Sequence, residues 1–115
     1  METEEWMVKH KVFIMIELFK NAESEYMDWL NRNRNGFVLN CDNAEDEIFV
    51  KDYFVMHKAT CFTISSQAGR YKFGGYTERN FMKYCSINKI DLIEKMKSFK
   101  MPKHTNIRFC KICNP

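Results

Sequence analysis

Hydrophobic and polar positions group along the chain into blocks that predict strands separated by two helices. Blocks rich in Val, Ile, Phe and Tyr predict strands at residues 8–19, 37–41, 53–57 and 81–85. The first block, residues 8–19, is also long enough to form a helix, and its periodicity does not distinguish the two. We interpret it as a strand because β-branched and aromatic residues dominate it.

The clearest helical pattern runs between Asn21 and Gly36. Asn21 is a suitable N-cap, and Glu23 and Glu25 fall in the first turn, where carboxylates interact well with the helix dipole. Gly36 suits the end of a helix. Five side chains share one face, and the apolar ones should pack on a sheet: Ala22, Tyr26, Trp29, Leu30 and Asn33.

A second helix is predicted after Asn88, which is a suitable N-cap with Asp91 three residues later. Pro102 should end it, since proline cannot continue a helix. The apolar side chains that fall near one face are Ile90, Ile93, Met96 and Phe99.

The order strand, helix, three strands, helix and tail predicts an α+β fold with a mostly antiparallel sheet of three to four strands and two helices. The chain has 115 residues, which is the size of one domain, so we expect a single domain over residues 1–115. With 45% hydrophobic residues, four Gly and two Pro, the composition is that of a folded protein.

The number of cysteines and the expected reducing compartment together predict a metal site. No apolar run approaches the roughly 20 residues that cross a bilayer, and the acidic first 11 residues are unlike a secretory signal. We therefore expect a cytoplasmic protein. An odd number of cysteines in a reducing environment favours metal binding over disulfides.

Two ligand pairs predict where the metal lies. Cys110 and Cys113 form a CxxC pair near the end of the chain, and His57 and Cys61 form a His-x3-Cys pair in its middle. Together they offer the four soft ligands of a structural zinc site, which would staple the C-terminal tail to the body. His104 is the alternative to His57.

The other two cysteines, Cys41 and Cys85, lie in apolar strand patterns, and we interpret both as core residues.

Charge is distributed unevenly along the chain. Residues 1–50 have 5 Lys/Arg and 11 Asp/Glu, whereas residues 51–115 have 13 and 4. The basic half would suit nucleic acid or an acidic protein, unless the two halves interleave in space. Basic and aromatic residues also alternate in one stretch, which predicts a partner-binding surface or a hairpin packed on the core: Arg70, Tyr71, Lys72, Phe73, Tyr76 and Arg79.

No catalytic motif accompanies these features, and carboxylates are few after residue 52, so we do not expect an enzyme. The segments GFVLN (36–40), HKATC (57–61) and YTER (76–79), with the terminal CxxC, resemble a small bacterial and phage domain that occurs beside nucleases and other defence-related proteins. The resemblance covers roughly residues 26–113.

In size, composition and predicted zinc site, the chain is also similar to anti-CRISPR proteins, some of which bind zinc and block Cas9. This resemblance implies a phage-encoded inhibitor that acts in the host cytoplasm by binding Cas9 or a related nuclease. The alternative function is a nucleic-acid-binding accessory module of a defence or restriction system that uses the basic second half of the chain.

Overall fold

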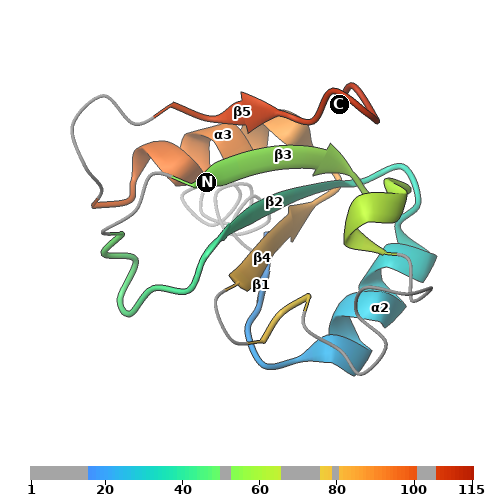
Figure 1. Ribbon diagram of the computed structural model, residues 1–115, viewed down its shortest axis with the longest axis horizontal. Helices are drawn as coiled ribbons and strands as arrows, with labels where there is room; N and C mark the ends of the chain where they lie inside the picture. Colours follow the sequence, from blue (N-terminus) through green and yellow to red (C-terminus); the bar gives the residue numbers. More distant parts are fainter. Residues whose placement is uncertain (1–15, 50–52, 66–75, 79–80, 101–105) are drawn as a thin grey trace, which may run out of the picture.

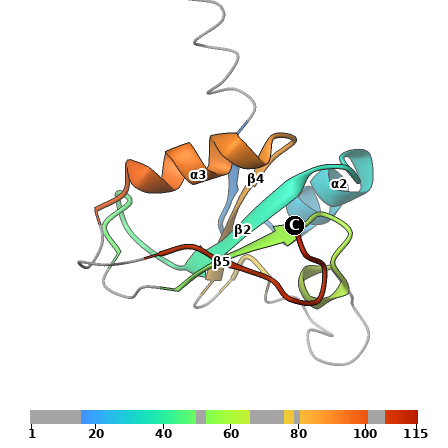
Figure 2. The same ribbon diagram turned by 90° about the horizontal axis from the view of Figure 1, so that it is seen from above.

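The computed structural model describes residues 16–49, 53–65, 76–78, 81–100 and 106–115, which form a mixed five-stranded sheet with a helix packed on each face (Figures 1 and 2). The elements in chain order are β1 (Glu17–Phe19), α2 (Glu23–Arg32), β2 (Phe37–Asp42), β3 (Phe54–Lys58), the 3-10 helix η1 (Phe62–Ile64), β4 (Phe81–Ser86), α3 (Lys89–Lys97) and β5 (Arg108–Phe109). The α+β prediction is thus confirmed.

The strands lie in the order β1-β4-β2-β3-β5. The three pairings among the first four are antiparallel, whereas β5 pairs with β3 in parallel. The prediction of three to four mostly antiparallel strands was therefore too small, because a strand of two residues leaves no detectable pattern in a sequence. Since β4 lies between β1 and β2, the acidic and basic halves of the chain interleave in the sheet.

Alternation along the strands divides the core into two layers. Val38 is paired with Cys85 on one side and His57 on the other, and this row faces α2. The neighbouring row, in which Leu39 is paired with Tyr84 and Met56, faces α3. Because His57 projects from the α2 face at the penultimate residue of β3, the pleat decides on which side of the sheet any site built from it must lie.

The start of α2 is held by Thr77 and not by Asn21. The residue at the N-cap position is Ala22, while Asn21 adopts a left-handed conformation with φ of 53°. The buried Thr77 hydroxyl accepts a hydrogen bond from the Ala22 N–H and donates one to Oε1 of Glu23, each 2.9 Å long. A threonine 55 residues away thus supplies the cap that local sequence assigned to Asn21.

The start of α3 agrees with the prediction, since Oδ1 of Asn88 accepts a hydrogen bond of 3.0 Å from the Ile90 N–H. Its buried face differs. Ile90 is 63% exposed, and Leu92 and Met96 are the buried residues of the helix. The helix also ends at Lys97, before the predicted stop at Pro102, which lies outside the described residues.

The predicted 8–19 strand lies partly within the described residues. Its described part contains β1, whereas residues 8–15 lie outside the described residues. Among the described residues, no helix combines the length and the apolar character needed to cross a membrane.

Candidate metal centre

Four side chains from two segments meet at the end of β3, and they are the four predicted as zinc ligands. The donor atoms of His57, Cys61, Cys110 and Cys113 all lie within 4.8 Å of one another. We call these four side chains the metal centre. Figure 1 shows the last turn of the chain beside the end of β3 and η1.

Local hydrogen bonds turn the His-x3-Cys segment back on itself. The Cys61 N–H donates to the Lys58 carbonyl at 3.0 Å, and the Ala59 N–H donates to the Gly36 carbonyl at 2.9 Å. The thiol of Cys61 also lies 3.0 Å from Oγ1 of Thr63, within hydrogen-bond distance. The turn therefore brings Cys61 back to the end of the strand that carries His57.

The tail reaches the same place by pairing with β3. The Cys110 N–H donates to the Met56 carbonyl at 2.9 Å, directly after the β5 pairing. The Asn114 N–H donates back to the Cys110 carbonyl at 3.0 Å, with Asn114 in the left-handed conformation (φ 50°) that asparagine tolerates. The Lys58 N–H then donates to Sγ of Cys113 at 3.2 Å. Both sulfurs of the CxxC pair are thus placed by backbone contacts.

The sulfur separation suits a shared metal ion and not a disulfide. Sγ of Cys61 lies 3.9 Å from Sγ of Cys110, and all five cysteines are free. Two thiolates on a tetrahedral zinc, each about 2.3 Å from the ion, are about 3.8 Å apart. A disulfide would need about 2.05 Å.

His57 is already in the chemical form that binds metal. Its side chain is 6% exposed, and its Nδ1 has no hydrogen-bond partner in the described structure. Burial, aided by the nearby charge of Lys83, lowers the pKa of His57 to about 4. The imidazole is therefore neutral at physiological pH, with a nitrogen available to a cation.

The thiols of the CxxC pair have different proton affinities. Burial raises the pKa of Cys113 to about 11. Burial acts in the same direction on Cys110, but hydrogen bonds from the backbone of Cys113 and Ile112 outweigh it and lower the pKa of that thiol. A metal ion binds thiolates, so it would displace protons from this group, and its affinity should rise with pH.

Cys41 and Cys85 stay outside the metal centre, as predicted. Both are fully buried in the core. Burial raises the pKa of Cys41 to about 12 and that of Cys85 well above its usual value. These thiols remain protonated and inert.

Lys83 is a neighbour of the centre that the sequence reasoning missed. It is 2% exposed, its Nζ donates to the Tyr76 carbonyl, and burial lowers its pKa to about 8. A lysine inside an otherwise apolar strand was the available signal.

The predicted partner-binding residues are not gathered into a surface by the described structure. Tyr76 is 3% exposed, and its ring packs 6.2 Å from that of Tyr26, so it lies in the core and does not present its ring to a partner. The other five, Arg70, Tyr71, Lys72, Phe73 and Arg79, lie outside the described residues. So does His104, the alternative ligand.

Comparisons with known proteins add no relative. The chain matches no protein-family model, no curated protein and no solved structure. The resemblance to anti-CRISPR proteins therefore has no relative to support it.

The shift of His57 predicts how the metal-free chain responds to acid. Because its pKa is about 4 when folded and about 6.5 when unfolded, protonation favours the unfolded chain. The contribution of His57 to stability is complete above about pH 6.5 and is lost as the pH falls towards 4. Urea unfolding of chelated protein between pH 7.5 and 4.5 should show this loss, and His57→Asn should flatten it. If the free energy of unfolding of His57→Asn fell with pH as steeply as that of the wild type, the lowered pKa of His57 would be contradicted.

Proposed function

We propose that the protein is a zinc-stabilised binding domain in which the metal centre holds one Zn²⁺ ion in a structural role. The observation that carries the proposal is the convergence of three cysteines and one histidine within 4.8 Å. Three thiolates and one imidazole are a soft, four-ligand set that suits tetrahedral zinc. With four protein ligands, the ion keeps no open position for a substrate, so the proposed role is structural and not catalytic.

The supporting physical argument is that the tail has little else to hold it. β5 has two residues, both exposed, and it pairs with β3 at two positions. Phe109 is 45% exposed and Ile112 is 62% exposed. The apolar contact of the tail with the core is made by Ile107, Cys110 and Cys113, all partly buried, so apolar burial alone holds the tail weakly. A metal ion bound by both halves of the centre would supply the missing attachment.

The proposed ligand set is tested by comparing variants of His57 and of His104, the alternative ligand. Elemental analysis of purified protein should give about one zinc per chain for the wild type and for His104→Asn. His57→Asn should lose most of the zinc, because it removes the only nitrogen donor of the centre. Loss of zinc in His104→Asn with retention in His57→Asn would replace His57 as a ligand.

The Cas9-type partner remains a prediction that rests on the resemblance. Of the features on which that resemblance rests, the predicted metal site is found among the described residues, as the cluster of His57, Cys61, Cys110 and Cys113. In the proposed role, the domain binds a nuclease effector and blocks cleavage without chemistry of its own. A pull-down with Cas9 orthologues and a DNA-cleavage assay test it. Absence of both binding and inhibition would exclude this partner while leaving the zinc proposal intact.

A further inference from the structure

The two chain segments that build the metal centre are basic and apolar. The two described segments that build the centre, residues 54–65 and 106–115, contain three Lys or Arg residues and no Asp or Glu. Several exposed side chains lie within two positions of the ligand cysteines, and we call the four basic and apolar ones on the side of the metal centre the rim: Phe62, Arg108, Lys111 and Ile112. Phe62 and Ile112 are each 62% exposed and form the apolar part of the rim.

The pleat of the sheet places Arg108 on the same face as the metal centre. Arg108 is opposite Val55 in the β3–β5 pairing, so it shares the α2 face with His57, two residues further along β3. Phe109 is opposite Met56 and so lies on the α3 face. The exposed ring of Phe109 therefore does not belong to the rim.

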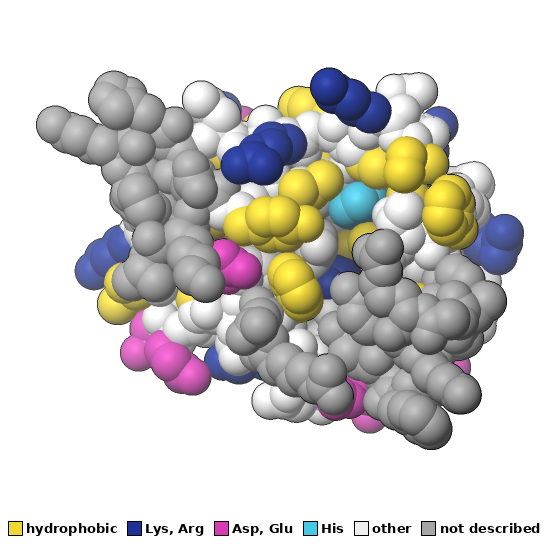
Figure 3. Space-filling view, viewed as in Figure 1, with side chains coloured by type: hydrophobic (Ala, Val, Ile, Leu, Met, Phe, Trp, Pro, Cys, Tyr) yellow, Lys and Arg dark blue, Asp and Glu magenta, His cyan; other side chains and the backbone are white. Residues whose placement is uncertain are grey.

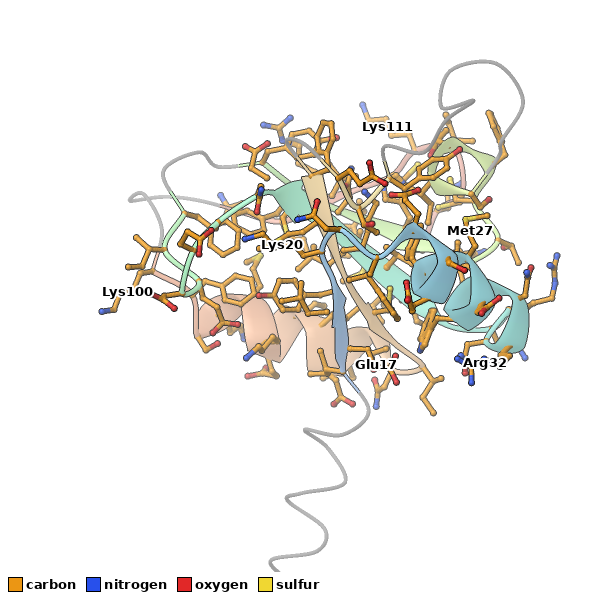
Figure 4. All side chains as sticks on the ribbon, turned by 90° about the horizontal axis from the view of Figure 1, so that it is seen from below. Glu17, Lys20, Met27, Arg32, Lys100 and Lys111 are labelled. Atoms are coloured by element: carbon orange, nitrogen blue, oxygen red, sulfur yellow. The ribbon has the colours of Figure 1, made fainter. Side chains whose placement is uncertain are left out.

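Two views of the molecule (Figures 3 and 4) show the side chains near the metal centre and the position of Lys111. In Figure 3, yellow and dark-blue side chains lie together around the cyan histidine, while the magenta ones lie mostly in the lower part of the view. Figure 4 shows Lys111 at the upper edge of the view, far from Lys100 at the left and from Arg32 at the lower right. No salt bridge within the described structure involves Arg108 or Lys111, so both charges are free for a partner.

We propose that the rim binds single-stranded nucleic acid. The inference rests on the proposed function, because the metal centre holds the rim together. The sulfur of Cys61 lies 3.9 Å from that of Cys110, so the chain segments that carry Phe62 and Lys111, each one residue further on, are brought side by side. An exposed aromatic ring next to free cations is the arrangement on which bases stack while phosphates are neutralised.

A single strand fits the rim better than a duplex. A ring and an isoleucine offer apolar contact to a base face, which a duplex keeps stacked inside. A protein interface can also combine a ring with an arginine, so binding of a protein partner is the competing outcome of the experiment. Arg108 and Lys111 account for about two phosphate contacts, so the affinity should be moderate and should fall about sevenfold between 50 and 200 mM salt.

Fluorescence anisotropy with labelled 20-nucleotide oligo-dT and oligo-rU, over a salt series, tests the proposal. The wild type should bind at least one of the two more tightly than a 20-base-pair duplex. The double variant Arg108→Ala/Lys111→Ala should reduce the slope of log K against log[salt] by about 1.4, since each lost contact to a single strand accounts for about 0.7. Arg32→Ala/Lys100→Ala removes the same charge away from the rim (Figure 4) and should leave the slope unchanged.

The contribution of base stacking on Phe62 is tested by a second pair of matched variants. Phe62→Leu removes the ring but keeps an apolar side chain, and it should weaken binding by about fivefold or more. Phe109→Leu makes the same change on the opposite face and should have no effect. Equal losses in both variants would overturn the proposed site.

The outcomes separate this inference from the proposed function. A zinc-loaded, folded wild type that binds neither oligonucleotide overturns the inference and leaves the zinc domain standing. A wild type without zinc contradicts the proposed function instead. If the rim variants lose binding to a protein partner while the wild type ignores both oligonucleotides, the rim is a protein-binding surface and the inference is wrong.

Discussion

Replacing Cys113 by serine should abolish zinc binding and lower the melting temperature by about 15 °C. A hydroxyl is a poor zinc ligand, so the variant leaves the ion with three donors and frees the tail from β3. Zinc at about a thousand times its dissociation constant stabilises a folded protein by about 4 kcal/mol, and each kcal/mol shifts the melting temperature of a small domain by about 4 °C. Differential scanning calorimetry with elemental analysis measures both quantities.

Cys41 provides the control, because it is a buried cysteine outside the centre. Cys41→Ala should lose some packing but keep about one zinc per chain. Chelation of the wild type should reproduce the lower melting temperature of Cys113→Ser and should change Cys113→Ser itself very little. A chelator-insensitive wild type, or a Cys113→Ser protein that keeps its zinc, would contradict the proposed ligand role.

Replacing Gly36 by alanine should destabilise the fold by about 2 kcal/mol. A Cβ at this position would lie 2.7 Å from Cη2 of Trp29, 3.0 Å from the Asn33 carbonyl oxygen and 3.2 Å from that of Ser86. Trp29 is 5% exposed and packed in the core, and the two carbonyls belong to the backbone, so none of the three moves easily. Overpacking of this kind costs about 1–3 kcal/mol.

Urea unfolding measures this effect, and Asn35→Ala is its control. Asn35 is the exposed neighbour of Gly36 in the same turn, and its replacement should change the free energy of unfolding by less than about 0.5 kcal/mol. The Gly36 carbonyl also accepts the Ala59 N–H in the turn that places Cys61. Gly36→Ala should therefore also weaken zinc binding. Equal stability of the two variants would show that the turn relaxes around the added methyl group.

The local pattern of the sequence was sufficient to predict most helices and strands. It failed where contacts with residues far away in the sequence determine the structure. The positions of α2, β2, β3, β4 and α3 follow from periodicity and Asn88 capping, which act within a few residues. The cap of α2 comes instead from Thr77, whose role depends on tertiary contact. Likewise, Leu92 replaces Ile90 on the buried face of α3 because the neighbouring sheet sets the orientation of the helix.

The residues of the candidate site could be predicted from the sequence because cysteine and histidine are uncommon and occur here at short spacings. The CxxC and His-x3-Cys pairs could be seen in the sequence. That the two pairs meet depends on the parallel pairing of β5 with β3, and a strand of two residues is too short to be predicted from the sequence. The side of the sheet on which Arg108 lies also depends on that register. The interleaving of the two charge halves was equally invisible before the strand order was known.

X-ray absorption spectroscopy at the zinc edge tests the central claim most directly. Purified wild-type protein should contain about one zinc per chain, with three sulfur ligands at about 2.3 Å and one nitrogen ligand at about 2.0 Å. Cys113→Ser should show no such spectrum. A wild-type zinc bound mainly by oxygen, or by fewer than three sulfurs, would contradict the metal centre formed by His57, Cys61, Cys110 and Cys113.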